Sequence, residues 1–154
     1  MKKHAFLIII LILALVFVTY KWVSTASECK ENSTGQSAIE NIMSRTSVRA
    51  YSDRAVDSTT VDTLLRAAMA APTAVNKQPW RFIVIDNKEI LKYISENFNS
   101  MKMAANASVA IVACGDMNAA LEGDGRDYWI QDVSAATENL LLAAHAMGLG
   151  AVWC

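Results

Sequence analysis

The sequence predicts an α+β domain, in which amphipathic helices are interspersed with short strands. Two observations carry this prediction. Apolar residues recur at helical spacing over residues 60–71, 88–98 and 129–147, and runs rich in apolar, aromatic and β-branched residues at 80–86 and 108–114 are typical of strands. A length of 154 residues fits one domain.

Residues 1–26 are predicted to be a signal-anchor or a signal peptide. Lys2 and Lys3 precede an apolar run from Ala5 to Val18, which is the pattern of a secretory signal or a membrane anchor. The run is short for a transmembrane helix, which needs about 17–25 residues. An uncleaved anchor is favoured over a cleaved signal. On this basis we expect a membrane-anchored or exported protein of a bacterial cell envelope, with the side that the domain faces left open.

Residues 27–43 are predicted to be a tether followed by a short helix. The polar segment before residue 36 has the composition of a linker. A helix over 36–43 would place Ile39, Ile42 and Met43 on one face. The domain proper is then predicted over 44–154.

The next helix is predicted over 60–71. Asp57 or Ser58 can cap its start, and Pro72 ends it. Its predicted buried stripe consists of Val61, Leu64, Leu65, Ala68 and Met69.

The remaining elements are predicted in chain order. The strand at 80–86 leads to an amphipathic helix over 88–98. The run at 108–114 is so evenly apolar that we expect a central strand covered on both faces. The helix over 129–147, ended by Gly148, is the predicted core helix.

A further strand is predicted to begin at Ala151. Because the sequence stops at Cys154, we expect a sheet that is incomplete at the C-terminus and a chain that is truncated. A short frayed strand is the alternative.

Composition excludes several classes of function. Without the three lysines of the leader, 11 basic residues face 15 acidic ones, and an acidic domain argues against a nucleic-acid partner. Cys29, Cys114 and Cys154 have no C-x-x-C spacing, so neither a metal site nor a disulfide framework is predicted. His4 and His145 are the only histidines, which leaves little material for a Ser-His or Cys-His pair.

The segment 71–80 is unusual for a connection between a helix and a strand. Pro72 and Pro79 restrict the backbone near both ends, and Asn76 and Gln78 carry amides between them. A stiff loop of this kind suits a flat polar ligand that lies close to the backbone. A rigid loop without a ligand is the alternative.

Residues 45–49 place two guanidinium groups four residues apart. Arg45 and Arg49 enclose the hydroxyl residues Thr46 and Ser47, and Arg suits bidentate contacts to phosphate. On spacing alone, two solvated arginines before a strand are favoured over a phosphate site.

Taken together, these motifs resemble the nitroreductase family of FMN-dependent oxidoreductases. The resemblance covers residues 44–154 and rests on four blocks in the same order: the R-T-S-V-R block with Tyr51, A-P-T-A-V-N-K-Q-P-W-R-F at 71–82, W-I-Q-D leading to E-N-L-L-L-A-A at 129–144, and G-L-G-A-V-W at 148–153.

The resemblance implies a three-layer α/β/α sandwich with a mixed, mainly antiparallel sheet. It also implies three groups of FMN-binding residues. Arg45, Thr46, Ser47 and Arg49 would hold the phosphate and the ribityl chain. Pro72, Thr73, Ala74 and Asn76 would reach the flavin across a homodimer interface. Trp153 and Cys154 would line the isoalloxazine.

The implied activity passes a hydride from NAD(P)H through FMN to a nitroaromatic, a quinone or a similar acceptor, with no catalytic side chain. Two alternatives stay open. Reductive dehalogenation or flavin fragmentation is another flavin reaction on the same scaffold. A non-catalytic fragment, or a dimerisation module without flavin, is an alternative outside the enzyme class.

Overall fold

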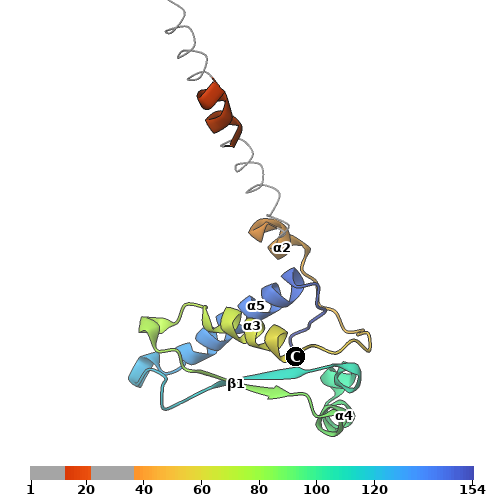
Figure 1. The fold of residues 1–154 in the computed structure, drawn as a ribbon. Helices are drawn as coiled ribbons and strands as arrows, with labels where there is room; N and C mark the ends of the chain where they lie inside the picture. Colours follow the sequence, from red (N-terminus) through yellow and green to blue (C-terminus); the bar gives the residue numbers. More distant parts are fainter. Residues whose placement is uncertain (1–12, 22–36) are drawn as a thin grey trace, which may run out of the picture. The chain divides into compact units, whose positions relative to one another are not determined.

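The computed structural model describes residues 13–21 and 37–154, and residues 38–154 form a compact unit in which helices lie on one face and at one end of a small sheet (Figure 1). Its helices and strands are α2 (Ala38–Ser44), α3 (Ser58–Met69), β1 (Trp80–Ile85), α4 (Lys88–Asn97), β2 (Ala110–Gly115) and α5 (Tyr128–Ala146). Three 3₁₀ segments connect them: η1 (Ala74–Asn76), η2 (Asn99–Asn106) and η3 (Gly123–Gly125).

The sheet of the described residues has two antiparallel strands. Trp80 of β1 lies opposite Gly115 of β2, and Ile85 lies opposite Ala110. Because α4 follows β1 and η2 precedes β2, both helical segments lie at the Ile85 end of the sheet (Figure 1). The α+β class is confirmed, whereas the three-layer sandwich with a mixed sheet stays a prediction.

Helix α5 forms the centre of the core, as its apolar sequence predicted. Its Val133 and Ala136 are buried in one cluster with Ala68, Ala71 and Trp80. The Asn139 side chain of α5 donates a hydrogen bond to the Ala67 carbonyl of α3 at 3.2 Å. The two helices are therefore joined by apolar packing and by a polar contact.

The helix ends follow the predicted capping residues. Asp57 caps α3, and its carboxylate accepts hydrogen bonds from the Thr60 backbone N–H at 2.8 Å and the Thr60 hydroxyl at 3.0 Å. Both hydrogen bonds lower the pKa of Asp57, and the bond from the Thr60 backbone has the larger effect. After α5, Gly148 has a φ of 71°, the left-handed conformation that a glycine adopts readily at a helix end.

The predicted apolar face of the short helix is not buried. Ile39, Ile42 and Met43 of α2 are exposed, and Asn41 is the buried residue. A hydrogen bond explains this orientation of α2, because the Asn41 amide donates to the Leu142 carbonyl of α5 at 2.9 Å. This contact turns the polar side of α2 toward the core.

Two strand predictions also need correction. β2 was expected to be covered on both faces, yet Val112 is exposed because, among the described residues, only one face of the sheet is covered by α5. Residues 151–154 form no strand. Their contact with the loop after α2 is a backbone bond from Val48 N–H to the Ala151 carbonyl, and a single bond does not make a strand ladder.

The predicted leader lies largely outside the described residues, which include only 13–21 of the range 1–26. Residues 13–21 are helical. Within residues 13–21 and 37–154, no helix is long and apolar enough to cross a membrane. This finding contradicts the predicted membrane-anchored or exported location, which is withdrawn together with the membrane partner. The predicted boundaries at residues 26 and 43 stay predictions.

The contact between Gly115 and Trp129 provides a test of this packing. A Cβ atom at Gly115 would overlap Cε3 of the Trp129 indole, at the start of α5. Gly115→Ala is therefore expected to lower the free energy of unfolding by about 1–3 kcal/mol, as overpacking does. Urea unfolding measures this loss.

Trp129→Leu is the background that isolates the contact. A smaller side chain removes the overlap, so Gly115→Ala should destabilise the Trp129→Leu protein much less. An equal loss in both backgrounds would show that the indole does not restrict residue 115.

Candidate functional site

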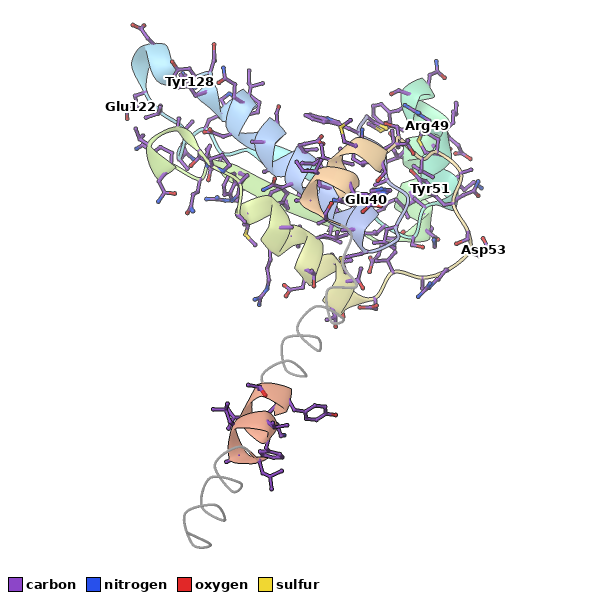
Figure 2. The ribbon with its side chains drawn as sticks, turned by 90° about the horizontal axis from the view of Figure 1, so that it is seen from above. Glu40, Arg49, Tyr51, Asp53, Glu122 and Tyr128 are labelled. Atoms are coloured by element: carbon purple, nitrogen blue, oxygen red, sulfur yellow. The ribbon has the colours of Figure 1, made fainter. Side chains whose placement is uncertain are left out.

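The predicted site residues fall into two groups at different ends of α5. Arg49 and Tyr51 lie toward the C-terminal end of the helix, whereas Tyr128 marks its N-terminal end (Figure 2). The Arg45–Arg49 segment belongs to the first group, and the Pro72–Asn76 segment belongs to the second.

Residues 45–49 form a loop that carries Arg45 and Arg49, which we call the arginine loop. Three polar contacts join α5 to the start of this loop and to the residues just before it. The Asn41 amide donates to the Leu142 carbonyl at 2.9 Å, and Ser44 Oγ lies 2.9 Å from Nε2 of His145. Arg45 Nε lies 3.8 Å from a carboxylate oxygen of Glu138. Because Glu138, Leu142 and His145 recur at helical spacing, one stripe of α5 holds the residues that precede the loop.

The arginine loop also lies against the segment after α5. The Val48 N–H donates to the Ala151 carbonyl at 2.9 Å. A Cβ atom at Gly150 would lie 2.7 Å from Cγ1 of Val48, so this close approach requires glycine. The structure thereby brings together two of the predicted groups, the arginine loop and residues 148–154.

Tyr51, Arg49 and Cys154 are neighbours in this region. Partial burial raises the pKa of the Tyr51 phenol, the charge of the Cys154 thiolate raises it further, and the Arg49 guanidinium lowers it. The Cys154 thiol lies 3.7 Å from the Ser100 carbonyl of η2. Trp153 and Cys154 are both exposed.

The loop at residues 72–78 is held in an unusual backbone conformation. Val75, Asn76 and Gln78 have φ values of 44°, 58° and 50°, which place three residues other than glycine in the left-handed region. Two hydrogen bonds hold the loop: the Ala74 N–H donates to Asp132 Oδ1 at 2.9 Å, and the Gln78 N–H donates to the Thr73 hydroxyl at 3.1 Å. Strained backbone of this kind is common at binding sites.

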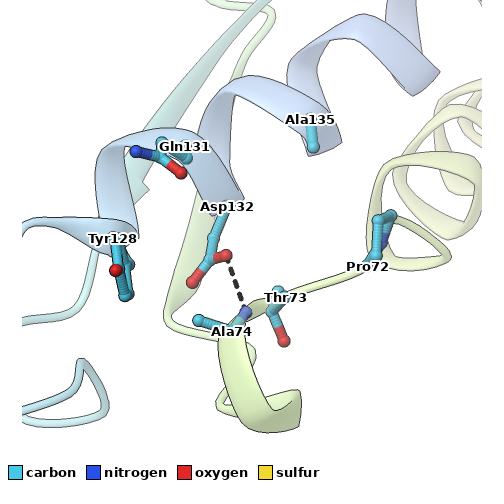
Figure 3. Close-up of a pocket in the computed structure, with 7 residues that line it drawn as sticks. All are labelled: Pro72, Thr73, Ala74, Tyr128, Gln131, Asp132 and Ala135. Atoms are coloured by element: carbon cyan, nitrogen blue, oxygen red, sulfur yellow. Dashed lines mark hydrogen bonds between the residues drawn. The ribbon is translucent and has the colours of Figure 1, made fainter. Parts of the chain in front are cut away.

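An open pocket of about 440 Å³ lies between this loop and the first turns of α5 (Figure 3). It is lined by Pro72, Thr73, Ala74, Tyr128, Gln131, Asp132 and Ala135. Of the predicted site residues, Pro72, Thr73 and Ala74 contribute to it, whereas the Asn76 side chain is exposed outside its lining.

Asp132 is the site residue that sequence reasoning missed. Its side chain is almost fully buried, and one carboxylate oxygen accepts the Ala74 N–H (Figure 3). The available signal was a single Asp within a mainly apolar helix, since a buried carboxylate needs a hydrogen-bond partner. The hydrogen-bond partner of Asp132, Ala74, lies 58 residues away in sequence. The local sequence pattern could not identify a partner at that distance.

The donor chemistry of the arginine loop fits a phosphate group. It presents two guanidinium groups with two exposed hydroxyls between them, and Arg and hydroxyl groups are phosphate donors. In the described part of the chain, no group of three His, Cys, Asp or Glu side chains is placed to hold a metal ion.

Comparisons with known proteins agree on one family. The sequence model described as "Nitroreductase family" matches residues 42–102 and 95–154. An Archaeoglobus fulgidus protein named "Putative NADH dehydrogenase/NAD(P)H nitroreductase" is 48% identical over 118 residues, which is 77% of this chain and 67% of that protein. A protein of the same name from Methanothermobacter thermautotrophicus is 45% identical over 75% of this chain and 59% of its own length.

Solved structures are similar as well. A crystal structure from Parabacteroides distasonis, with the same name, has a TM-score of 0.71 and 42% identity, and the match covers 77% of this chain and 67% of that chain. A nitroreductase-named structure from Desulfovibrio desulfuricans, solved in complex with FMN, has a TM-score of 0.67 and 35% identity over 78% of this chain and 69% of that chain. The present chain thus spans about three fifths to two thirds of the length of these relatives.

The strain at Val75 provides a test of the loop. A β-branched residue in the left-handed region is disfavoured by about 1–2 kcal/mol, whereas Asn tolerates it. Val75 is exposed, so its side chain contributes little packing. Val75→Asn is expected to raise the free energy of unfolding by about 1 kcal/mol, as measured by urea unfolding.

Val75→Thr is the matched control, because it keeps the β-branch and the strain. It should leave the stability within about 0.5 kcal/mol of the parent. If Asn stabilises the protein no more than Thr does, residue 75 does not carry the strain that its φ indicates.

Proposed function

The chain belongs to the nitroreductase family, and on this premise we propose that it is an FMN-dependent NAD(P)H oxidoreductase. The observation that carries the proposal is the arginine loop, which presents Arg45 and Arg49 beside the segment after α5. Relatives support it: one is named FMN reductase [NAD(P)H], and one similar structure was solved with FMN.

The phosphate of FMN would be held by Arg45 and Arg49, with the hydroxyls of Thr46 and Ser47 as further donors. Charge-assisted hydrogen bonds from guanidinium groups are about twice as strong as neutral ones. The anchoring of the loop start by Asn41 orders this region before the ligand arrives, which reduces the entropy lost on binding.

The flat ring of FMN would contact the loop that carries Pro72, Thr73 and Ala74. This loop is bonded to Asp132, whereas the arginine loop follows residues bonded to Leu142 and His145. Leu142 and His145 lie ten and thirteen residues after Asp132, which is about 15–20 Å along α5, and Arg45 itself pairs with Glu138, six residues or about 9 Å after Asp132. The two groups are thus separated within one chain.

We therefore include a homodimer in the proposal, with FMN at the interface. The arginine loop of one copy and the 72–76 loop of the other would form one site. In this proposal, Asn76, Trp153 and Cys154 would also lie beside the flavin ring. The three-layer α/β/α sandwich with a mixed sheet is part of the proposal.

FMN supplies the redox chemistry when bound, by taking a hydride from NAD(P)H and passing electrons to an acceptor. The chain's own residues bind and orient. Asp132 holds the backbone of Ala74 in place, and Thr73 fixes the loop through Gln78. No side chain is assigned a proton-transfer role. A nitroaromatic, a quinone or a similar acceptor is the proposed substrate class.

A flavin-binding measurement tests this proposal. The purified chain, reconstituted with FMN, should be yellow and hold about one FMN per chain. Arg45→Ala should weaken FMN binding by removing a charge-assisted bond that contributes roughly 1.5–3 kcal/mol, a loss of about 10- to 150-fold in affinity. Fluorescence titration measures the dissociation constant.

Arg66→Ala is the control, since Arg66 is an exposed arginine that pairs with Asp62 on α3. It should leave FMN affinity unchanged. Colourless protein that binds no FMN after reconstitution would reject the oxidoreductase and favour a dimerisation module without flavin. Unchanged affinity in Arg45→Ala would reject the assignment of that residue alone.

A further inference from the structure

One acidic side chain lies beside the proposed phosphate site. Glu138, on α5, has a carboxylate oxygen 3.8 Å from Nε of Arg45. The Arg45 side chain is 24% exposed and the Glu138 side chain 49% exposed, so the pair lies at the surface and is open to a ligand. Positive charge in a loop favours the binding of phosphate. A carboxylate beside the loop reduces this positive charge.

The contact with Glu138 involves one edge of the Arg45 guanidinium. A guanidinium presents two N–H edges, one that includes Nε and one formed by the two Nη groups. The Glu138 oxygen lies 3.8 Å from Nε, so the edge formed by the two Nη groups is the one that we expect to meet a phosphate. A partly exposed ion pair of this length contributes about 0–1 kcal/mol to stability, so we expect the fold to survive the loss of the acid.

The charge of Glu138 acts against the ligand that Arg45 would bind. A phosphate monoester carries a charge of about −1.5 to −2 at neutral pH. Repulsion between this charge and a carboxylate on the far side of the same guanidinium is weakened by solvent, but it persists at low ionic strength. Glu138 thus has two opposed effects: it orients Arg45, and it reduces its attraction for a dianion.

We propose that Glu138 is a positioning and specificity-determining residue that limits the preference of this site for phosphorylated flavin. The proposal rests on the proposed function, because it needs the arginine loop to hold the FMN phosphate. It predicts that the negative charge of Glu138 weakens the binding of FMN. The charge should not affect the binding of riboflavin, which lacks the phosphate.

The test compares FMN and riboflavin binding to the full chain and to Glu138→Gln. Gln keeps the size of the side chain and an oxygen for Arg45, and it removes the charge. At about 0.01 M salt, Glu138→Gln should bind FMN roughly 3- to 10-fold more tightly, and at about 1 M salt the gain should fall below about 2-fold. Riboflavin affinity should be unchanged at both concentrations.

Glu96→Gln is the matched control. Glu96 is an exposed acid on α4 whose Oε1 also lies 3.8 Å from a cation, the ammonium group of Lys92. Its substitution removes the same charge and the same kind of ion pair away from the arginine loop, and FMN affinity should not change. Circular dichroism of each variant without flavin checks that the fold is retained.

Glu138→Met separates orientation from charge, because it removes both the charge and the oxygen that holds Arg45. It should gain less FMN affinity than Glu138→Gln does. Equal gains would overturn the positioning role.

Three other results overturn the specificity role while the proposed function stands: FMN binding by the parent with no gain in Glu138→Gln, a gain that riboflavin shares, or a gain that salt does not reduce. If the parent binds neither flavin, the proposed function fails, and this inference fails with it.

Discussion

Burial of helix α5 is the constraint on which the rest of this structure depends. Its apolar side packs against α3 and β1, and its polar positions attach the surrounding loops. Asp132 fixes the 72–78 loop through Ala74, and Leu142 receives the amide of α2 that precedes the arginine loop. These contacts let α5 help to position both proposed ligand-binding loops.

The sequence predicted the elements whose signals are local. Spacing and capping residues placed α3, α4 and α5 to within about two residues, because amphipathic periodicity and Asp57 act within one or two turns. What it could not predict depends on distant partners. Asn41 is buried because it bonds to a carbonyl 101 residues away, so the apolar residues of α2 face outward. Among residues 13–21 and 37–154, one face of β2 is uncovered for a similar reason: the fold decides which elements cover a strand, and the composition of the strand does not specify them.

The candidate site shows the same division. The residue types of the arginine loop and the 72–78 loop suit a ligand, but spacing alone favoured solvated arginines, and the resemblance to the family supplied the proposed roles of both loops. Asp132 was missed because its role is to hold backbone, and the three left-handed residues around Val75 could not be anticipated from a sequence that offers no glycine there. Resemblance to the nitroreductase family supplied the FMN, and the family itself is confirmed by the comparisons. The membrane assignment rested on two lysines before an N-terminal apolar run, and it is contradicted because no helix of the described residues is long and apolar enough to cross a membrane.

In the proposed function, two copies of the chain share each flavin site: the arginine loop comes from one copy and the 72–76 loop from the other. Complementation between two defective chains tests it most directly. One chain carries Arg45→Ala and Arg49→Ala, the other carries Thr73→Ala and Asn76→Ala, and neither alone should bind FMN. When the two are unfolded and refolded together, each mixed dimer should contain one intact site and bind about one FMN per two chains. If the mixture binds no more FMN than the separate chains do, the site is not shared and the account is contradicted.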